Sequence, residues 1–132
     1  MTHAFATLDE LGEGPGFRKV RAALGIEAFG VNAIVLAPGA EGFLHYHDIQ
    51  DELYFVHSGT ARMEAGDEVR ELGPGGLCHV AATTARRVSN AGDDELVVLV
   101  VGAKGGYIGR DGQLLDPDDV ERRKQFGSGA AQ

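Results

Sequence analysis

The sequence has little cysteine, no tryptophan and few basic residues. Its 132 residues include one cysteine, and 12 Lys and Arg stand against 20 Asp and Glu. A single cysteine excludes an internal disulfide and suits a reducing compartment, so we expect a cytoplasmic protein. The net charge of -8 argues against nucleic-acid binding and against docking on an anionic membrane, because both need a basic face.

Long apolar runs are also missing. No stretch approaches the roughly 20 apolar residues of a membrane helix. Residues 1–11 have neither the basic start nor the apolar run of a signal peptide. A chain of this length suits one domain with a proper core, and a hydrophobic content of 43% is ordinary for a globular protein. Because the net charge argues against nucleic acid and anionic membranes, we expect the partner to be a small molecule.

Glycine is abundant, and its spacing predicts an all-β fold. The 20 glycines separate short runs of branched and aromatic residues, as turns separate strands. We expect strands over 29–36, 53–56, 61–64, 77–80, 86–90 and 95–101.

The flanking segments are harder to assign from pattern alone. Residues 1–16 form an approach segment, with a helical turn over 7–10, and the β domain covers 17–115. Within it, 17–25 is ambiguous and we favour an edge strand, because basic side chains blunt strand pairing. The Asp-Gly of 110–113 predicts a hairpin tip. Residues 116–132 are expected to form a short helix capped by Asp116, and then a disordered tail.

The stretch 39–59 contains three residues that can bind a metal together. His45 and His47 are two apart, so on a strand both side chains leave by the same face. Glu52 follows a short polar turn and opens the next strand. Two imidazoles and a carboxylate suit non-haem iron, and also zinc or manganese. We therefore predict a divalent metal site for iron, manganese, zinc or nickel.

The same stretch resembles the first motif of the cupins. That motif has glycine, five residues, His-x-His, four residues, Glu, six residues and glycine, and its positions are filled by Gly39, His45, His47, Glu52 and Gly59. Residues 66–90 resemble the second motif. Its first half is matched by Gly66, Leu72, Pro74 and Gly75, and its last position by Asn90. The resemblance implies a double-stranded β-helix, or jelly-roll barrel, with a metal pocket inside. It also implies a homodimer, but no particular reaction.

The second motif departs from the family pattern at one position. Where cupins usually supply a further histidine, this chain has Arg86, which cannot bind a metal because it stays protonated. In one alternative, Arg86 anchors an anionic substrate beside a three-ligand metal. In a second, it pairs with Glu52 and leaves the pocket free of metal. In a third, it turns away from the pocket.

Strand parity separates the remaining candidates. Tyr54 shares the inward face of Glu52, so it is a candidate catalytic residue beside Arg86, or a barrel-lining tyrosine bonded to its neighbours. His57 and His79 are expected outside, although His79 could replace the missing histidine if the parity is reversed. Cys78 is expected inside, as a small buried apolar residue.

These residues leave two classes of function open. One is a metal-dependent enzyme of the dioxygenase, isomerase, lyase or decarboxylase type that acts on a small polar or carboxylated molecule. The other is a metal-free or non-catalytic small-molecule-binding protein in which Arg86 holds an anionic ligand. Chelation should abolish activity in the first, whereas a ligand should stabilise the second without turnover.

Overall fold

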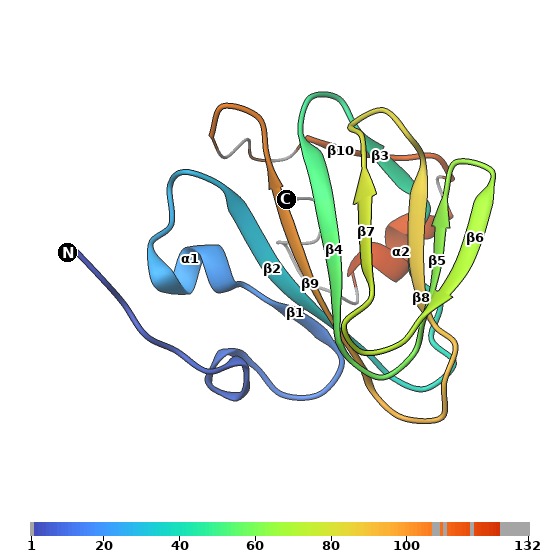
Figure 1. Cartoon of the computed structure of the whole chain (residues 1–132), viewed down its shortest axis with the longest axis horizontal. Coiled ribbons are helices and arrows are strands. Elements are labelled where there is room, and N and C mark those ends of the chain that lie inside the picture. The colour runs from blue at the N-terminus through green and yellow to red at the C-terminus, as the bar shows by residue number, and fades with distance from the viewer. Residues whose placement is uncertain (1, 107–108, 110, 117, 125–132) are drawn as a thin grey trace.

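Two antiparallel five-stranded sheets face each other in the computed structural model of this protein, which describes residues 2–106, 109, 111–116 and 118–124 (Figure 1). The first sheet has the order β1-β2-β9-β4-β7. Its strands are β1 (Gly16–Arg18), β2 (Gly30–Leu36), β4 (Asp51–Ser58), β7 (Leu77–Val80) and β9 (Leu96–Ala103). The second sheet has the order β10-β3-β8-β5-β6. Its strands are β3 (His45–His47), β5 (Ala61–Ala65), β6 (Glu68–Leu72), β8 (Arg86–Asn90) and β10 (Gly112–Leu114). The predicted double-stranded β-helix is confirmed.

The core lies between the sheets and follows the predicted alternation. Along β4, Glu52, Tyr54 and Val56 are buried, whereas Leu53 and His57 are exposed. Alternation arises because successive side chains leave a strand by opposite faces. The apolar residues buried in the core are Ile34, Leu36, Phe43, Tyr54, Val56, Ala61, Met63, Val80, Val88, Leu96, Val98 and Val100.

Two residues of the motif regions fix the turns that frame this core. Gly59 has φ +85°, and a Cβ there would stand 2.6 Å from the Glu95 carbonyl oxygen, so only glycine fits. The Asn90 amide donates to the carbonyl oxygens of Leu36, Ala37 and Asp94 at 2.8–3.1 Å. Asn90 therefore ties the end of β8 to two loops, which is a structural role.

Two expectations about secondary structure are wrong. Residues 17–25 form not one edge strand but β1 and a short helix, α1 (Val20–Leu24), which ends at Gly25 in the left-handed conformation. Residues 112–113 belong to β10, which pairs with β3, and so they are not a hairpin tip. Pairing with a distant strand overrides the local turn preference of Asp-Gly in the second case.

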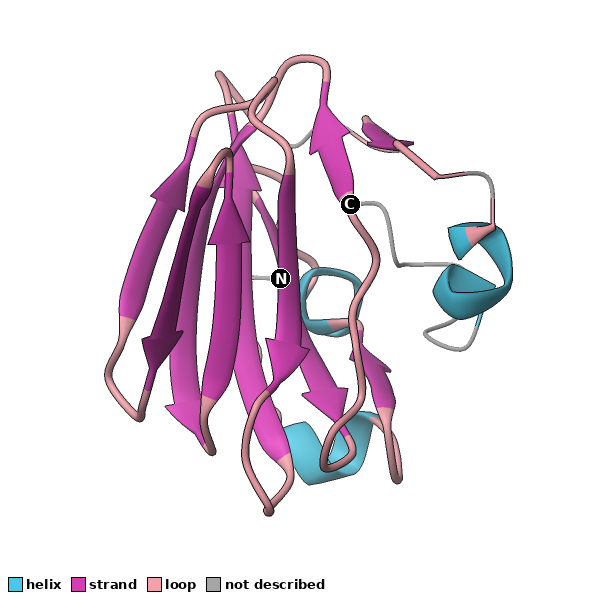
Figure 2. Ribbon diagram, turned by 90° about the vertical axis from the view of Figure 1, so that its right-hand side faces the viewer, coloured by secondary structure: helices cyan, strands magenta, loops and turns pink. Residues whose placement is uncertain are grey.

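The other short elements agree with the sequence. A 3₁₀ turn, η1 (Leu8–Leu11), has the Thr7 backbone amide donating to the Glu10 carboxylate. The C-terminal helix, α2 (Asp119–Lys124), follows Asp116, whose carboxylate accepts from the Asp118 amide at 2.9 Å. Helix α2 lies on the outside of the sheets, at the right in Figure 2. The tail expected beyond residue 124 lies outside the described residues. Within the described part of the chain, no helix has the length and apolarity needed to cross a bilayer.

Candidate metal site

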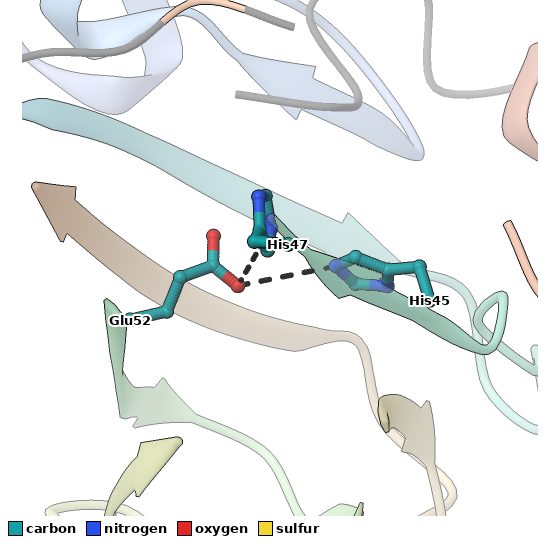
Figure 3. Close-up of side chains that lie close together, drawn as sticks. All are labelled: His45, His47 and Glu52. Atoms are coloured by element: carbon teal, nitrogen blue, oxygen red, sulfur yellow. Dashed lines mark ion pairs between the residues drawn. The ribbon is translucent and has the colours of Figure 1, made fainter. Parts of the chain in front are cut away.

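The three predicted ligands come together from the two sheets. His45 and His47 project from β3 of the second sheet, and Glu52 projects from β4 of the first (Figure 3). One ligand atom from each lies within 4.8 Å of the others. The site forms here because a turn over 48–50 carries the chain from one sheet to the other, so the two inward faces meet.

A single carboxylate oxygen is the centre of the cluster. Glu52 Oε1 lies 3.2 Å from His47 Nε2 and 3.9 Å from His45 Nε2. Nitrogen and oxygen ligands that bind a common ion at about 2.1 Å stand about 3.0–3.4 Å apart. The pair of Glu52 and His47 already has this spacing, whereas His45 must move closer to Glu52. The donors therefore fit a divalent ion.

The surroundings keep Glu52 ionised. Burial raises the pKa of Glu52, but hydrogen bonds and charge attraction from His45 and His47 outweigh it and hold the pKa well below its usual range. The Tyr54 hydroxyl donates to Glu52 Oε1 at 2.8 Å. Burial, and then the charge of Glu52, raise the pKa of Tyr54 well above its usual value, so this tyrosine is a neutral donor. It is bonded to its neighbour, as expected for a barrel-lining tyrosine.

Arg86 lies inside the barrel beside these groups. Its side chain is fully buried, and Nη1 stands 3.9 Å from Glu52 Oε1. Arg86 sits on β8, directly opposite His45 of β3. The alternative in which Arg86 turns out of the pocket is therefore wrong.

The hydrogen bonds of Arg86 are incomplete. Nη2 donates to the carbonyl oxygens of Ala81, at 2.9 Å, and Val80, at 3.5 Å. Nε and Nη1 have no hydrogen-bond acceptor among the residues that the structure describes. A buried N–H without a hydrogen bond lowers the stability of a protein by about 1–3 kcal/mol. These two groups are therefore able to donate to an acceptor from outside the chain.

A small cavity adjoins the ligands. It has a volume of about 30 Å³, and its polar wall consists of His45, Glu52 and Tyr54. The rest of the wall is apolar, apart from backbone, and is formed by Phe17, Ile34, Leu36, Gly42, Phe43, Val88 and Val100. By this measure the space holds about one or two water molecules.

The other candidate residues lie away from the cluster. His57 and His79 are exposed on the outer face of the first sheet, as parity predicts. His79 is not part of the three-residue group. Cys78 packs against the core, and burial raises the pKa of its thiol.

Sequence reasoning missed one residue of the site. Asp111 is buried, and its Oδ2 lies 3.7 Å from His47 Nδ1. The same oxygen accepts hydrogen bonds from the amides of Ile49 and Gln50. A local signal could not place it, because it is some 60 residues away from the turn that it contacts.

Two facing sheets that close around a His-His-Glu cluster define the double-stranded β-helix class of proteins with an internal site. The cupin domain family matches residues 33–102, and the chain belongs to that family. No curated protein matches the chain significantly.

Solved structures support the fold. A cupin protein from Bacteroides fragilis has a TM-score of 0.67 and 22% identity, over 79% of this chain and 86% of its own. A protein with a double-stranded β-helix domain from Klebsiella pneumoniae reaches 0.70 at 21% identity, over 85% and 96%. A sugar phosphate isomerase from a cupin superfamily in Silicibacter pomeroyi reaches 0.66 at 26% identity, over 76% of each chain.

Proposed function

We propose that this protein binds a divalent metal ion through His45, His47 and Glu52 and acts on a small polar or carboxylated molecule there. The observation that carries this proposal is the convergence of three ligand atoms within 4.8 Å, from two strands in different sheets. His45, His47 and Glu52 would hold the ion, and because they supply only three ligands, positions would stay open for polarising a substrate or activating water. That chemistry suits a dioxygenase, isomerase or lyase.

The neighbouring side chains have separate roles in this proposal. Tyr54 orients the Glu52 carboxylate through its 2.8 Å hydrogen bond, so that Oε1 faces the histidines. Arg86 is not among the residues that line the cavity, but its buried guanidinium lies next to Glu52. It would supply two N–H groups to an anionic substrate that extends past Glu52, because a guanidinium presents donors in the planar fork that a carboxylate accepts. Its positive charge also offsets part of the negative charge that an anion brings into a buried site.

The cavity favours a compact substrate. Its volume of about 30 Å³, room for about one or two water molecules, and its apolar walls suit only the smallest charged or metal-binding groups. A sugar phosphate, the class named for the Silicibacter pomeroyi protein, has many hydroxyls that these walls could not bond. A small carboxylate is the better match. The net charge of -8 also favours a small-molecule ligand over nucleic acid.

A second candidate function is metal-free anion binding. The position of Arg86 favours it, because Nη1 lies 3.9 Å from the oxygen that a metal would use. A guanidinium at that place competes with a cation for the Glu52 carboxylate. In this function, Arg86, together with His45 and His47, holds a small anion without turnover.

The metal content of the purified protein tests the first function. Elemental mass spectrometry, without chelator or added metal, should find about one iron, manganese, zinc or nickel per chain. A His45→Ala, His47→Ala double variant should lose it, whereas a His57→Ala, His79→Ala double variant is the matched control. Wild-type protein that stays empty after incubation with divalent ions would refute the metal site and leave the anion-binding function.

Turnover separates the two functions further. Activity that chelation abolishes and added metal restores supports the enzyme. Stabilisation by small carboxylates, with no product, supports the binding protein. The homodimeric state and cytoplasmic location remain predictions that size-exclusion chromatography with light scattering and cell fractionation can test.

A further inference from the structure

Asp111 connects the C-terminal part of the fold to the strand that carries both histidines. It directly precedes β10, which pairs antiparallel with β3 so that Gly112 stands opposite His47 and Leu114 opposite His45. The contact of β3 with β8, in contrast, is a single residue pair. The position of the histidine strand therefore depends strongly on the segment that begins at Asp111.

The Asp111 side chain holds the turn between the ligands. Its Oδ2 accepts from the Ile49 amide at 2.9 Å and from the Gln50 amide at 2.8 Å, while its backbone oxygen accepts from the Asp48 amide at 3.3 Å. These three consecutive amides belong to the turn that carries the chain from His47 to Glu52. Asp111 thus fixes the path that sets the distance between two of the three candidate ligands.

The same carboxylate faces the far side of the His47 ring. Nε2 points to Glu52 Oε1 at 3.2 Å, whereas Nδ1 lies 3.7 Å from Asp111 Oδ2 and 3.3 Å from the Gln50 side-chain amide. A negative charge behind a metal-binding imidazole fixes the ring orientation and raises its basicity. Both ring nitrogens of His47, which is almost fully buried, thus face a carboxylate.

We propose that Asp111 is the positioning residue of this site: it holds the β3–β4 turn and the His47 ring in the arrangement that binds the ion. This inference rests on the proposed metal function for its effect on affinity, but its structural part does not. In metal-binding proteins, loss of such an outer partner typically lowers affinity 10- to 100-fold.

Two variants separate the two contributions. Asp111→Asn keeps an oxygen that can accept from the turn amides but removes the charge behind His47, so Zn²⁺ and Mn²⁺ affinity should fall about tenfold. Asp111→Ala loses both, and the fall should approach 100-fold. The control is Asp48→Asn, because the Asp48 carboxylate accepts only from the exposed Gln113 amide among the bonds described, at 3.0 Å.

Isothermal titration calorimetry with each ion measures affinity, and amide hydrogen exchange followed by NMR measures the turn in the metal-free protein. Asp111→Ala should lose protection at Ile49 and Gln50, Asp111→Asn should keep most of it, and the His47 ring resonances should shift in both. Wild-type affinity in both variants, in protein whose wild type binds metal, would overturn the proposal. If the wild type binds no ion, the metal function fails. The positioning role would be overturned separately if Asp111→Ala kept the wild-type amide protection and the wild-type His47 ring resonances.

Discussion

An Arg86→Met variant should show separately how much Arg86 contributes to the stability of the fold and how much it contributes to ligand binding. In the metal-free protein, its attraction to Glu52 at 3.9 Å is about 4 kcal/mol for an effective dielectric constant of about 20. The hydrogen bond from Nη2 to the Ala81 carbonyl adds about 2 kcal/mol. The two unbonded N–H groups offset this by about 1–3 kcal/mol each. The expected net loss in the free energy of unfolding is therefore only about 2 kcal/mol.

The ligand response should change much more. An acetate or formate ion that accepts from Nε and Nη1 stabilises the wild type by about 2.7 kcal/mol at 100 times its dissociation constant. The variant should gain nothing at the same concentration. Urea unfolding followed by circular dichroism, with chelator present and with matched chloride in place of the carboxylate, measures both quantities.

Arg87 provides the control on the same strand. Its guanidinium bonds the Glu64 carboxylate at 2.7 and 3.2 Å near the surface, so Arg87→Met should cost about 1 kcal/mol and leave the carboxylate response intact. Equal stabilisation of wild type and Arg86→Met by acetate and formate would refute the anion role. A loss well above about 4 kcal/mol without ligand would instead make Arg86 a structural ion-pair partner.

Three further predictions concern the surrounding structure. The hydrogen bond from Arg87 lowers the pKa of Glu64 below its ordinary 4.5, so between about pH 5 and pH 3 the unfolded chain binds more protons than the folded chain, and the free energy of unfolding falls as the pH falls. Glu64→Gln should flatten this pH dependence in urea titrations over the same range. An unchanged dependence of the free energy of unfolding on pH would contradict the prediction. Burial raises the pKa of Cys78, so its reaction with a disulfide reagent at neutral pH should be slower than that of the urea-unfolded chain, and equal rates would count against this packing. Gly59→Ala should cost about 2 kcal/mol or more in chemical unfolding, because φ is +85° and the added methyl meets a backbone carbonyl, whereas Gly75→Ala, also at positive φ but in open space, should cost less.

The barrel and the proximity of His45, His47 and Glu52 could be predicted because both follow from local patterns in the sequence. Alternation along 52–58 gives the inward face of β4, and the two-residue spacing of His45 and His47 places both rings on one side. Glycines at the turns mark where strands end. The inward parity of Arg86 likewise predicted its burial.

What the sequence could not provide depends on distant contacts. Asp111 and Gly112 have the local form of a turn. Pairing with β3, which lies far away in the sequence, instead places Gly112 in strand β10, and Asp111 is buried. The short helix α1 was missed because helix propensity in 20–24 competed with an all-β context. The size of the cavity depends on how its ten lining residues pack, which no pattern specifies.

The brace between Asp111 and the histidine strand has a consequence for how the protein folds. The three candidate ligands fall within eight consecutive positions, 45–52, whereas the carboxylate that braces them is 61 residues beyond Gln50. Closing such a long loop is slow compared with forming a local turn, because chain entropy must be lost before the contact forms. During synthesis, the ligands emerge long before their brace. We therefore expect the ability to hold an ion tightly to be gained late, after the last strand has docked, so that tight metal loading would distinguish a finished barrel from a partly folded one.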